Sequence, residues 1–181
     1  MEFLTQLIFI LFAAAFPLLI VSYLFFCFLI ELFGPPFVPT SSRIIKKILD
    51  EANLEPGQFF IELGSGDGRV VREAVKNYGV RGLGVERHPF LVWFARVMAR
   101  LERVEHIEYR RGNFFGVDLR EADVIFMFLI PRVMKKLKGK LERECQKGTI
   151  IISHGFKIPG WDKKIYKTQP RFSFTTYFYK I

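Results

Sequence analysis

The stretch that decides the fold is residues 60–69, which read FIELGSGDGR. An apolar segment typical of a buried strand runs into Gly64, Gly66 and Gly68, and a helix-forming segment follows. Glycine lets the backbone turn sharply and approach a ligand closely, and the N–H groups at the start of a helix add positive potential. Strand, glycine loop and helix in this order predict a ligand-binding turn at the edge of an α/β sheet.

The acidic residues near this loop indicate which ligand it suits. The glycines are spaced Gly-x-Gly-x-Gly, whereas dinucleotide-binding loops read Gly-x-Gly-x-x-Gly. Glu62 and Asp67 would repel a pyrophosphate by about 1 kcal/mol or more per charge pair at 4 Å, even in water. Glu86 follows at the end of the next expected strand, where a carboxylate accepts hydrogen bonds from ribose hydroxyls. The pattern favours a cationic nucleoside, S-adenosylmethionine (SAM). A dinucleotide oxidoreductase, or a glycine turn with solvated acids, is the alternative.

The rest of the chain alternates between strand-like and helix-like segments. Short apolar segments are expected as strands at 58–63, 82–86, 106–110, 123–130 and 148–153, with a terminal hairpin at 163–168 and 174–181. Apolar residues at helical spacing predict helices from about residue 42 to 52 and at 69–78, 89–103 and 131–145. Strict alternation with apolar strands predicts a Rossmann-like α/β fold with a parallel sheet covered on both faces. Ligands of such sheets lie at the carboxyl ends of the strands.

The N-terminus has a different composition. Residues 3–30 contain no charged side chain. As a helix, residues 7–30 would be about 36 Å long, which is enough to cross a bilayer core of about 30 Å. We expect a retained transmembrane anchor at 1–34, in contact with lipid through residues 7–30, followed by one catalytic domain at 35–181. A cleavable signal peptide lacks support because no basic residue precedes the apolar stretch, and a buried core helix rarely avoids charge for so long.

The net charge of +9 is unevenly distributed. Residues 1–42 contain no lysine or arginine, so the remainder carries all 27 basic residues. The first of them are Arg43, Lys46 and Lys47, and the positive-inside rule then predicts a cytoplasmic catalytic domain. The sequence has no arginine-rich stripe with interleaved aromatic residues, so we expect no nucleic-acid partner. It has no Cys/His cluster, so we expect no metal. Cys27 and Cys145 are too few for a disulfide framework, which favours a reducing compartment.

Five motifs together resemble a known family. They are Pro36-Phe37-Val38-Pro39, Leu63-Gly64-Ser65-Gly66-Asp67-Gly68-Arg69, Gly84-Val85-Glu86 followed by Pro89, Arg110-Arg111, and Phe128-Leu129-Ile130-Pro131. The chain resembles a class I SAM-dependent methyltransferase. More narrowly, it is similar to the small membrane-anchored lysine methyltransferases whose mitochondrial members modify the adenine nucleotide translocase and the ATP synthase c-subunit. The resemblance covers most of residues 35–161 and implies the seven-stranded sheet of that class.

The resemblance also implies roles for individual residues. The methionine part of SAM is expected against Glu62, Gly64, Ser65, Gly66, Asp67 and Gly68. Glu86, followed by Arg87, would hold the ribose. Asn113 would contact the adenine, with Phe114 or Phe115 against the ring. Glu62 and Asn113 stand where aspartate is commoner in the family, and Arg87-His88 replaces an apolar residue and asparagine.

The acceptor side is expected where the fourth strand ends. There Phe128, Leu129 and Pro131 would form a channel for the target amine, although Phe128 could also be core, as we expect for Phe126. His154 ends the fifth strand and could take a proton or be a satisfied loop residue. Trp93 and Phe94 are expected in the core. Trp161 follows Pro159-Gly160 and either closes over the substrate or packs in the interior.

These expectations define one function and its competitors. We expect a membrane-anchored, single-pass SAM-dependent N-methyltransferase that modifies lysine on a membrane-associated protein. A prokaryotic inner membrane is favoured over a mitochondrial one, because the N-terminus lacks the arginines of a transit peptide. The alternatives are a methyltransferase for a lipid or small-molecule amine and a non-catalytic SAM-binding scaffold.

Overall fold

The computed structural model describes residue 6, residue 13, residues 15–24, 40–170 and 174–181. The chain forms two compact units, Met1–Val38 and Pro39–Ile181. The second unit contains α2 (Ser42–Ala52), β1 (Phe59–Leu63), α3 (Arg69–Tyr78), β2 (Arg81–Glu86), α4 (Pro89–Leu101), β3 (Ile107–Arg111), η1 (Phe114–Gly116), β4 (Val124–Met127), α5 (Pro131–Glu144), β5 (Ile150–His154), η2 (Asp162–Lys164), β6 (Ile165–Gln169) and β7 (Thr176–Lys180).

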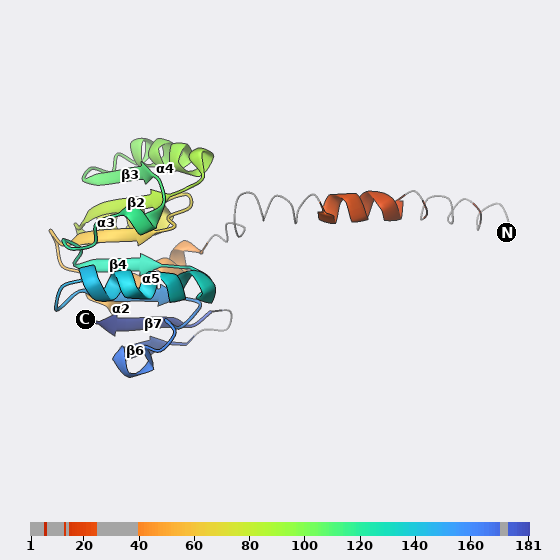
Figure 1. The fold of residues 1–181 in the computed structure, drawn as a ribbon. Helices are drawn as coiled ribbons and strands as arrows, with labels where there is room; N and C mark the ends of the chain where they lie inside the picture. The colour runs from red at the N-terminus through yellow and green to blue at the C-terminus, as the bar shows by residue number, and fades with distance from the viewer. Residues whose placement is uncertain (1–5, 7–12, 14, 25–39, 171–173) are drawn as a thin grey trace. The chain divides into compact units, whose positions relative to one another are not determined.

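The strands form one seven-stranded sheet in the order β3-β2-β1-β4-β5-β7-β6 (Figure 1). Strands β1 to β5 pair in parallel, and β7 is antiparallel to both β5 and β6. The expected parallel sheet and terminal hairpin are therefore confirmed. After β3 the chain returns to the centre and places β4 against the free side of β1, so the strand order reverses there. Loops that leave such a point diverge and open a ligand-binding crevice.

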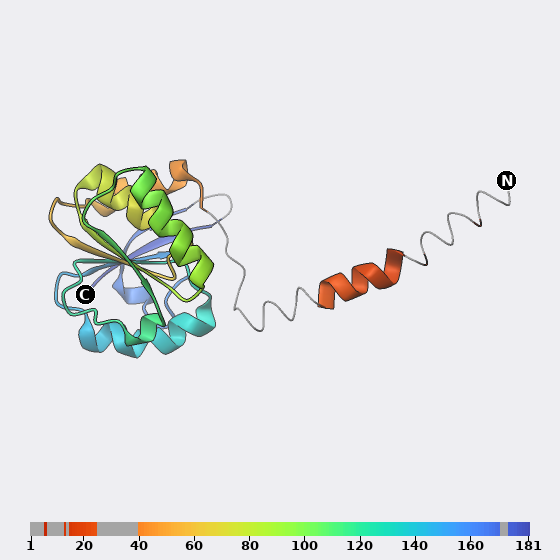
Figure 2. The same cartoon turned by 90° about the horizontal axis from the view of Figure 1, so that it is seen from above.

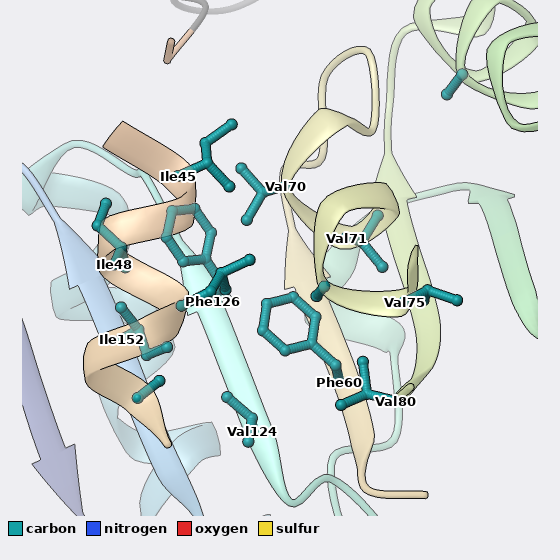
Figure 3. Close-up of a cluster of buried hydrophobic side chains, with 14 of the residues drawn as sticks. Ile45, Ile48, Phe60, Val70, Val71, Val75, Val80, Val124, Phe126 and Ile152 are labelled. Carbon is teal, nitrogen blue, oxygen red and sulfur yellow. The ribbon is translucent and has the colours of Figure 1, made fainter. Parts of the chain in front are cut away.

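Helices cover both faces of the sheet. Figure 2 shows α2, α3 and α4 on one side and α5 on the other. Side chains alternate along a strand. The layer formed by α2, α3 and α4 therefore packs against Phe60, Val124 and Phe126 (Figure 3). Their neighbours Ile61 and Ile125 pack toward α5 instead. Both faces of the central strands are buried, which explains why the sequence reads as near-continuous apolar segments, and Phe126 is core as expected.

The structure corrects the prediction for Trp93 and decides between the two alternatives for Trp161. Trp93 is not core: its side chain is 57% exposed on the outer side of α4. Trp161 is buried, packs on Tyr179 and donates from Nε1 to Glu142 Oε1 at 2.8 Å. The lid interpretation of Trp161 is therefore wrong, because the indole N–H has a partner in the interior and the ring fills the core beneath α5.

Most of the expected membrane span lies outside the described residues. Residues 15–24 are helical. Within the part of the chain that the structure describes, no helix combines the length and the apolar character required to cross a bilayer.

Candidate functional site

The candidate site lies where β1, β2 and β4 end. The glycine loop 64–68 follows β1, and Glu86 is the last residue of β2. Leu63 pairs with Val85 on one side and with Met127 on the other, so the three strand ends share one edge of the sheet. The topology therefore brings together the sequence-predicted donor residues on β1 and β2 and the acceptor residues after β4.

Internal hydrogen bonds fix the glycine loop. Gly64 N and Ser65 N both donate to Val85 O, at 2.9 and 3.0 Å, and Gly68 N donates to Ser65 O at 2.8 Å. Gly64, Gly66 and Gly68 all have positive φ. The need for glycine is clearest at Gly68, which has φ +71°, and where a Cβ would lie 2.6 Å from Cζ and Oη of Tyr109.

Tyr109 is a supporting residue that the sequence interpretation missed. Its ring is buried below the loop, and its hydroxyl donates to Gly68 O at 2.9 Å. Burial raises its pKa well above the ordinary value of 10.0, so the hydroxyl keeps its proton and remains a donor. A signal was present in the sequence: Tyr109 is the one residue of IEYRR that must face inward between charged neighbours.

Glu86 closes the loop from the second strand. One carboxylate oxygen accepts from Gly66 N at 2.9 Å, and the other accepts from Arg87 N at 2.7 Å and His88 N at 2.9 Å. A carboxylate has about four lone-pair positions, so one remains for a ligand hydroxyl. The predicted ribose residue thus lies directly against the loop, although its role in binding stays a prediction. The Arg87 side chain is exposed.

The Asp67 carboxylate is held by an arginine of the following helix, and its predicted contact with the donor stays a prediction. Its carboxylate accepts from Arg69 Nε at 2.9 Å and from Arg69 Nη2 at 2.6 Å. A second arginine that the sequence interpretation missed, Arg72, donates to Asp67 O at 3.0 Å and pairs with Glu102 at 2.9 Å. Arg69 also donates to Thr40 O at 3.1 Å. The charge of Asp67 is therefore compensated within the protein, and the carboxylate contributes to holding the loop.

Glu62 is buried under the loop with its charge only partly balanced. One carboxylate oxygen accepts from Val71 N at 2.9 Å. Burial is the main cause that raises the pKa of Glu62 well above its ordinary value of 4.5, and the negative charges of Asp67 and Glu86 raise it further. A cation placed at this loop would oppose that shift, because opposite charge stabilises the ionised carboxylate.

The loop fits SAM better than a pyrophosphate. Its backbone donors are largely used internally, and Gly66 N is held by a carboxylate that would repel a phosphate. The Ser65 hydroxyl is buried and has no hydrogen-bond partner among the described residues, so it could serve a ligand. A ligand with hydroxyls and positive charge matches Ser65, Glu86 and Glu62.

The predicted adenine residues lie at the neighbouring strand end. Asn113 follows β3, and Gly112 N donates to Glu86 O at 2.9 Å, which keeps this turn beside the ribose residue. The Asn113 side-chain oxygen accepts from Phe115 N at 3.1 Å and caps η1. Phe114 and Phe115 are half-buried, with ring centroids 5.0 Å apart. Their position is consistent with a wall for a base, and the contact itself stays a prediction.

An aromatic cluster marks the acceptor side. The expected strand 123–130 ends at Met127, so Phe128 and Leu129 lie in a loop before Pro131 begins α5. Phe128 is half-buried, and its ring centroid lies 4.8 Å from His154 and 5.1 Å from Phe174. Leu129 lies over Gly64, where a Cβ would be 3.1 Å from its Cδ2.

His154 belongs to this cluster as a buried, hydrogen-bonded residue. Its Nδ1 lies 2.9 Å from the Thr176 hydroxyl, and the ring is 2% exposed. Its burial and this partner agree with the interpretation of a satisfied histidine, and it helps to hold Phe128 in place.

A cavity lies away from this site, and the described residues form no metal-binding cluster. A cavity of about 290 Å³, lined by residues such as Val80, Val104 and His106, opens where β2 and β3 begin, at the opposite edge of the sheet. Within the described ranges, no three His, Cys, Asp or Glu side chains are grouped closely enough to hold a metal ion.

Comparison with known proteins identifies the family. Residues 62–165 match the ANTKMT methyltransferase domain. The chain is 35% identical over 152 residues to a protein-lysine N-methyltransferase of Saccharolobus islandicus, an alignment that covers 81% of this chain and 93% of that protein. It is also 35% identical over 128 residues to the adenine nucleotide translocase lysine N-methyltransferase of Mus musculus, covering 70% of this chain but 55% of that protein.

A solved structure agrees with these matches. An RNA methyltransferase from Salinibacter ruber, in complex with S-adenosyl-L-homocysteine, superposes with a TM-score of 0.76 and 34% sequence identity. The superposition covers 80% of this chain and 94% of that one. The chain described here belongs to the ANTKMT methyltransferase domain family and is a SAM-dependent methyltransferase.

Proposed function

We propose that this enzyme transfers the methyl group of SAM to the side-chain amine of a lysine, on a protein at a membrane surface. The observation that carries the proposal is the 35% identity to a protein-lysine N-methyltransferase across 93% of that protein's length. Alignment over nearly a whole relative supports a shared reaction more strongly than alignment of the donor loop alone, which many methyltransferase classes share.

SAM supplies an electrophilic methyl carbon on a positively charged sulfur when it is bound. In this proposal Glu86 accepts from the ribose, while Ser65 and the backbone of loop 64–68 line the methionine part. Glu62 adds negative potential beneath the loop. The reaction is an in-line displacement: the lysine nitrogen forms a bond to the methyl carbon as the carbon–sulfur bond breaks. The protein therefore contributes mainly alignment, which supplies about 7–11 kcal/mol.

The acceptor lysine must first lose a proton. At pH 7 this costs roughly 4.6 kcal/mol for an amine with a pKa of about 10.4. Phe128, Leu129 and Phe174 give the acceptor side apolar walls, and an apolar environment favours the neutral amine. Water can then remove the proton, so a dedicated base is not required by this scheme.

The membrane location is supported by the sequence. The uncharged stretch 3–30 is long enough for one crossing. Arg43, Lys46 and Lys47 follow it and favour a catalytic domain on the cytoplasmic side, with a prokaryotic inner membrane preferred. A tether of this kind would confine the enzyme to acceptors near the bilayer and raise their effective concentration.

RNA is the second candidate acceptor, because the similar protein from Salinibacter ruber, at 34% identity, is named an RNA methyltransferase. A lipid amine and a small-molecule amine are further outcomes. The decisive experiment incubates the purified full-length chain with isotopically labelled SAM and membranes from the source organism. Label is then assigned by mass spectrometry to peptide, RNA or lipid, with parallel samples treated by protease or ribonuclease.

We expect label in lysine-containing peptides of a membrane protein, resistant to ribonuclease. A Glu86→Gln variant, which should bind SAM more weakly, should show strongly reduced labelling at low SAM concentration. Glu108→Gln, which removes an exposed carboxylate paired with Arg110 on β3, should retain it and serves as the matched control. Label that disappears with ribonuclease, or that partitions with lipid, would replace lysine as the acceptor. SAM binding without any transfer would indicate a scaffold.

A further inference from the structure

Helix α4 presents an apolar surface on the side that faces away from the sheet. Val92, Ala95 and Ala99 form its buried side. On the opposite side, Phe90, Trp93 and Leu101 are 59%, 57% and 72% exposed. Surface helices normally carry polar residues there. The outward apolar side of α4 therefore requires a partner or an environment of its own.

The outward-facing apolar residues form one continuous stripe, in which Phe94 and Val97 are half-buried. Phe90, Phe94, Val97 and Leu101 recur at intervals of four, three and four residues, which places them in a line along the helix. The ring of Phe90 lies 5.7 Å from that of Trp93 and 6.4 Å from that of Phe94, centroid to centroid. We call these five residues, Phe90, Trp93, Phe94, Val97 and Leu101, the α4 apolar stripe.

Positive charge flanks the stripe. Helix α4 contains Arg96 and Arg100 and no acidic residue, and exposed Arg103 follows it. Between Arg96 and Arg103 the only acid is Glu102, which already pairs with Arg72 and Lys76. Arg96 donates to Tyr109 O at 2.6 Å, but among the described residues none of these three arginines forms an ion pair with an acid. An apolar, aromatic helix face beside such arginines is the composition of helices that lie in the plane of a membrane surface. Anionic head groups provide the complementary charge.

The stripe begins close to the donor site. Pro89 starts α4 three residues after Glu86, so the aromatic end of the helix lies at the carboxyl edge of the strands. Figure 2 shows α4 in the same layer as α2 and α3, alongside the outer strands of the sheet. A surface that contacts Phe90 and Trp93 would therefore lie beside the edge where methyl transfer occurs.

We propose that the α4 apolar stripe inserts into the interface of an anionic bilayer and orients the catalytic edge toward it. The inference rests on the membrane location within the proposed function, and it is independent of which acceptor is methylated. A bilayer suits the stripe better than a protein groove, because arginines and no acidic residue flank it along α4 and anionic head groups supply the complementary charge. Tryptophan is also favoured at the depth of the head groups, and Trp, Phe and Leu form the apolar face of helices that lie in the interface.

Trp93 provides a direct readout. The chain has two tryptophans, and the other, Trp161, is buried in the domain. The full-length chain is reconstituted into vesicles of phosphatidylcholine alone or mixed with phosphatidylglycerol, in each case with and without brominated acyl chains. We expect brominated lipid to quench Trp93 in the anionic vesicles. In Trp93→Phe the remaining Trp161 signal should be insensitive to bromine, which sets the background.

Two variants test the parts of the stripe separately. Phe90→Ser should reduce the quenching of Trp93. Arg100→Gln should shift the ratio of inserted to free α4 by about fivefold, the factor expected for one basic residue near an anionic surface. Tyr166→Ser is the matched control, because Tyr166 is a 50% exposed aromatic on the opposite edge strand, β6, and it should leave quenching unchanged.

The outcomes separate this inference from the proposed function. Vesicles that carry the chain on flotation but do not quench Trp93 would overturn the docking of α4 while leaving the anchor intact. Equal quenching in both lipid mixtures would overturn the role given to the arginines. A concentration-dependent blue shift of Trp93 without lipid would identify a second copy as the occupant and overturn the proposal. Quenching in a chain that methylates no lysine would support it and refute the proposed acceptor.

Discussion

Replacement of Gly68 by alanine tests the packing of the donor loop on Tyr109. Gly68 has φ +71°, and its added Cβ would meet Tyr109 Cζ and Oη at 2.6 Å. A non-glycine residue in the left-handed region costs about 1–2 kcal/mol. The tyrosine ring is buried and would have to move, which adds about 1–3 kcal/mol for overpacking and about 1 kcal/mol for the lost bond to Gly68 O. We expect a loss of about 3–6 kcal/mol in the free energy of unfolding.

Gly57→Ala is the matched control for backbone strain. Gly57 also has a positive φ, +85°, but a Cβ there would meet nothing within 4 Å. Its substitution should therefore cost only the backbone penalty of about 1–2 kcal/mol. Both variants are measured by urea unfolding of the full-length chain in a mild detergent, and SAM affinity is measured by calorimetry. Gly68→Ala should also weaken SAM binding, whereas Gly57→Ala should not.

A double-mutant cycle then isolates the clash. Tyr109→Leu removes the ring atoms that the new Cβ would meet, at a cost of about 2 kcal/mol. Gly68 O keeps a partner in this variant, because Arg72 N also donates to it. The double variant should be about 2 kcal/mol more stable than the sum of the single costs predicts. Additive costs, or a Gly68→Ala penalty no larger than that of Gly57→Ala, would refute the packing argument.

Three further predictions concern the donor and acceptor sides. Because burial raises the pKa of Glu62, the donor-free protein should lose stability as pH rises from 4.5 through that raised pKa. The affinity for SAM should increase over the same pH range, because the cation favours the ionised carboxylate. Calorimetry in several buffers should detect proton release on SAM binding, and the Glu62→Gln variant should show no such release. Glu86→Gln should weaken SAM binding about 10- to 100-fold, because a charged acceptor for the loop and the ribose is lost, whereas unchanged affinity would place the ribose elsewhere. Phe128→Ala should retain SAM binding and lose methyl transfer, and unchanged turnover in a labelling assay would remove Phe128 from the acceptor channel.

The sequence was sufficient for the architecture because its signals are local. Helix α3 spans the expected residues, since Gly68 and Gly79 both adopt the left-handed conformation that begins and ends it. The strands were recognisable because burial on both faces of the sheet demands continuous apolar segments. The end of β4 was misjudged by three residues, because Phe128 to Ile130 are as apolar as the strand but lie in the loop before Pro131.

The contacts that shape the site are long-range, and local patterns do not reveal them. Tyr109 lies 41 residues beyond Gly68, which it supports, and Trp161 finds its hydrogen-bond partner 19 residues back along the chain. The sequence alone also does not show that Arg69 folds back onto Asp67. Trp93 was assigned to the core because α4 is apolar on several sides, and its sequence does not show which apolar residues face the sheet.

The Glu86 carboxylate accepts hydrogen bonds from three backbone N–H groups, and these bonds limit how the enzyme could be redesigned. The same carboxylate closes the glycine loop through Gly66 and fixes the turn into α4 through Arg87 and His88. Any substitution of Glu86 therefore also removes acceptors that hold the backbone around it. Conversion to a phosphate-bearing cofactor would therefore require the loop, the second-strand acid and the following turn to be replaced together as one block.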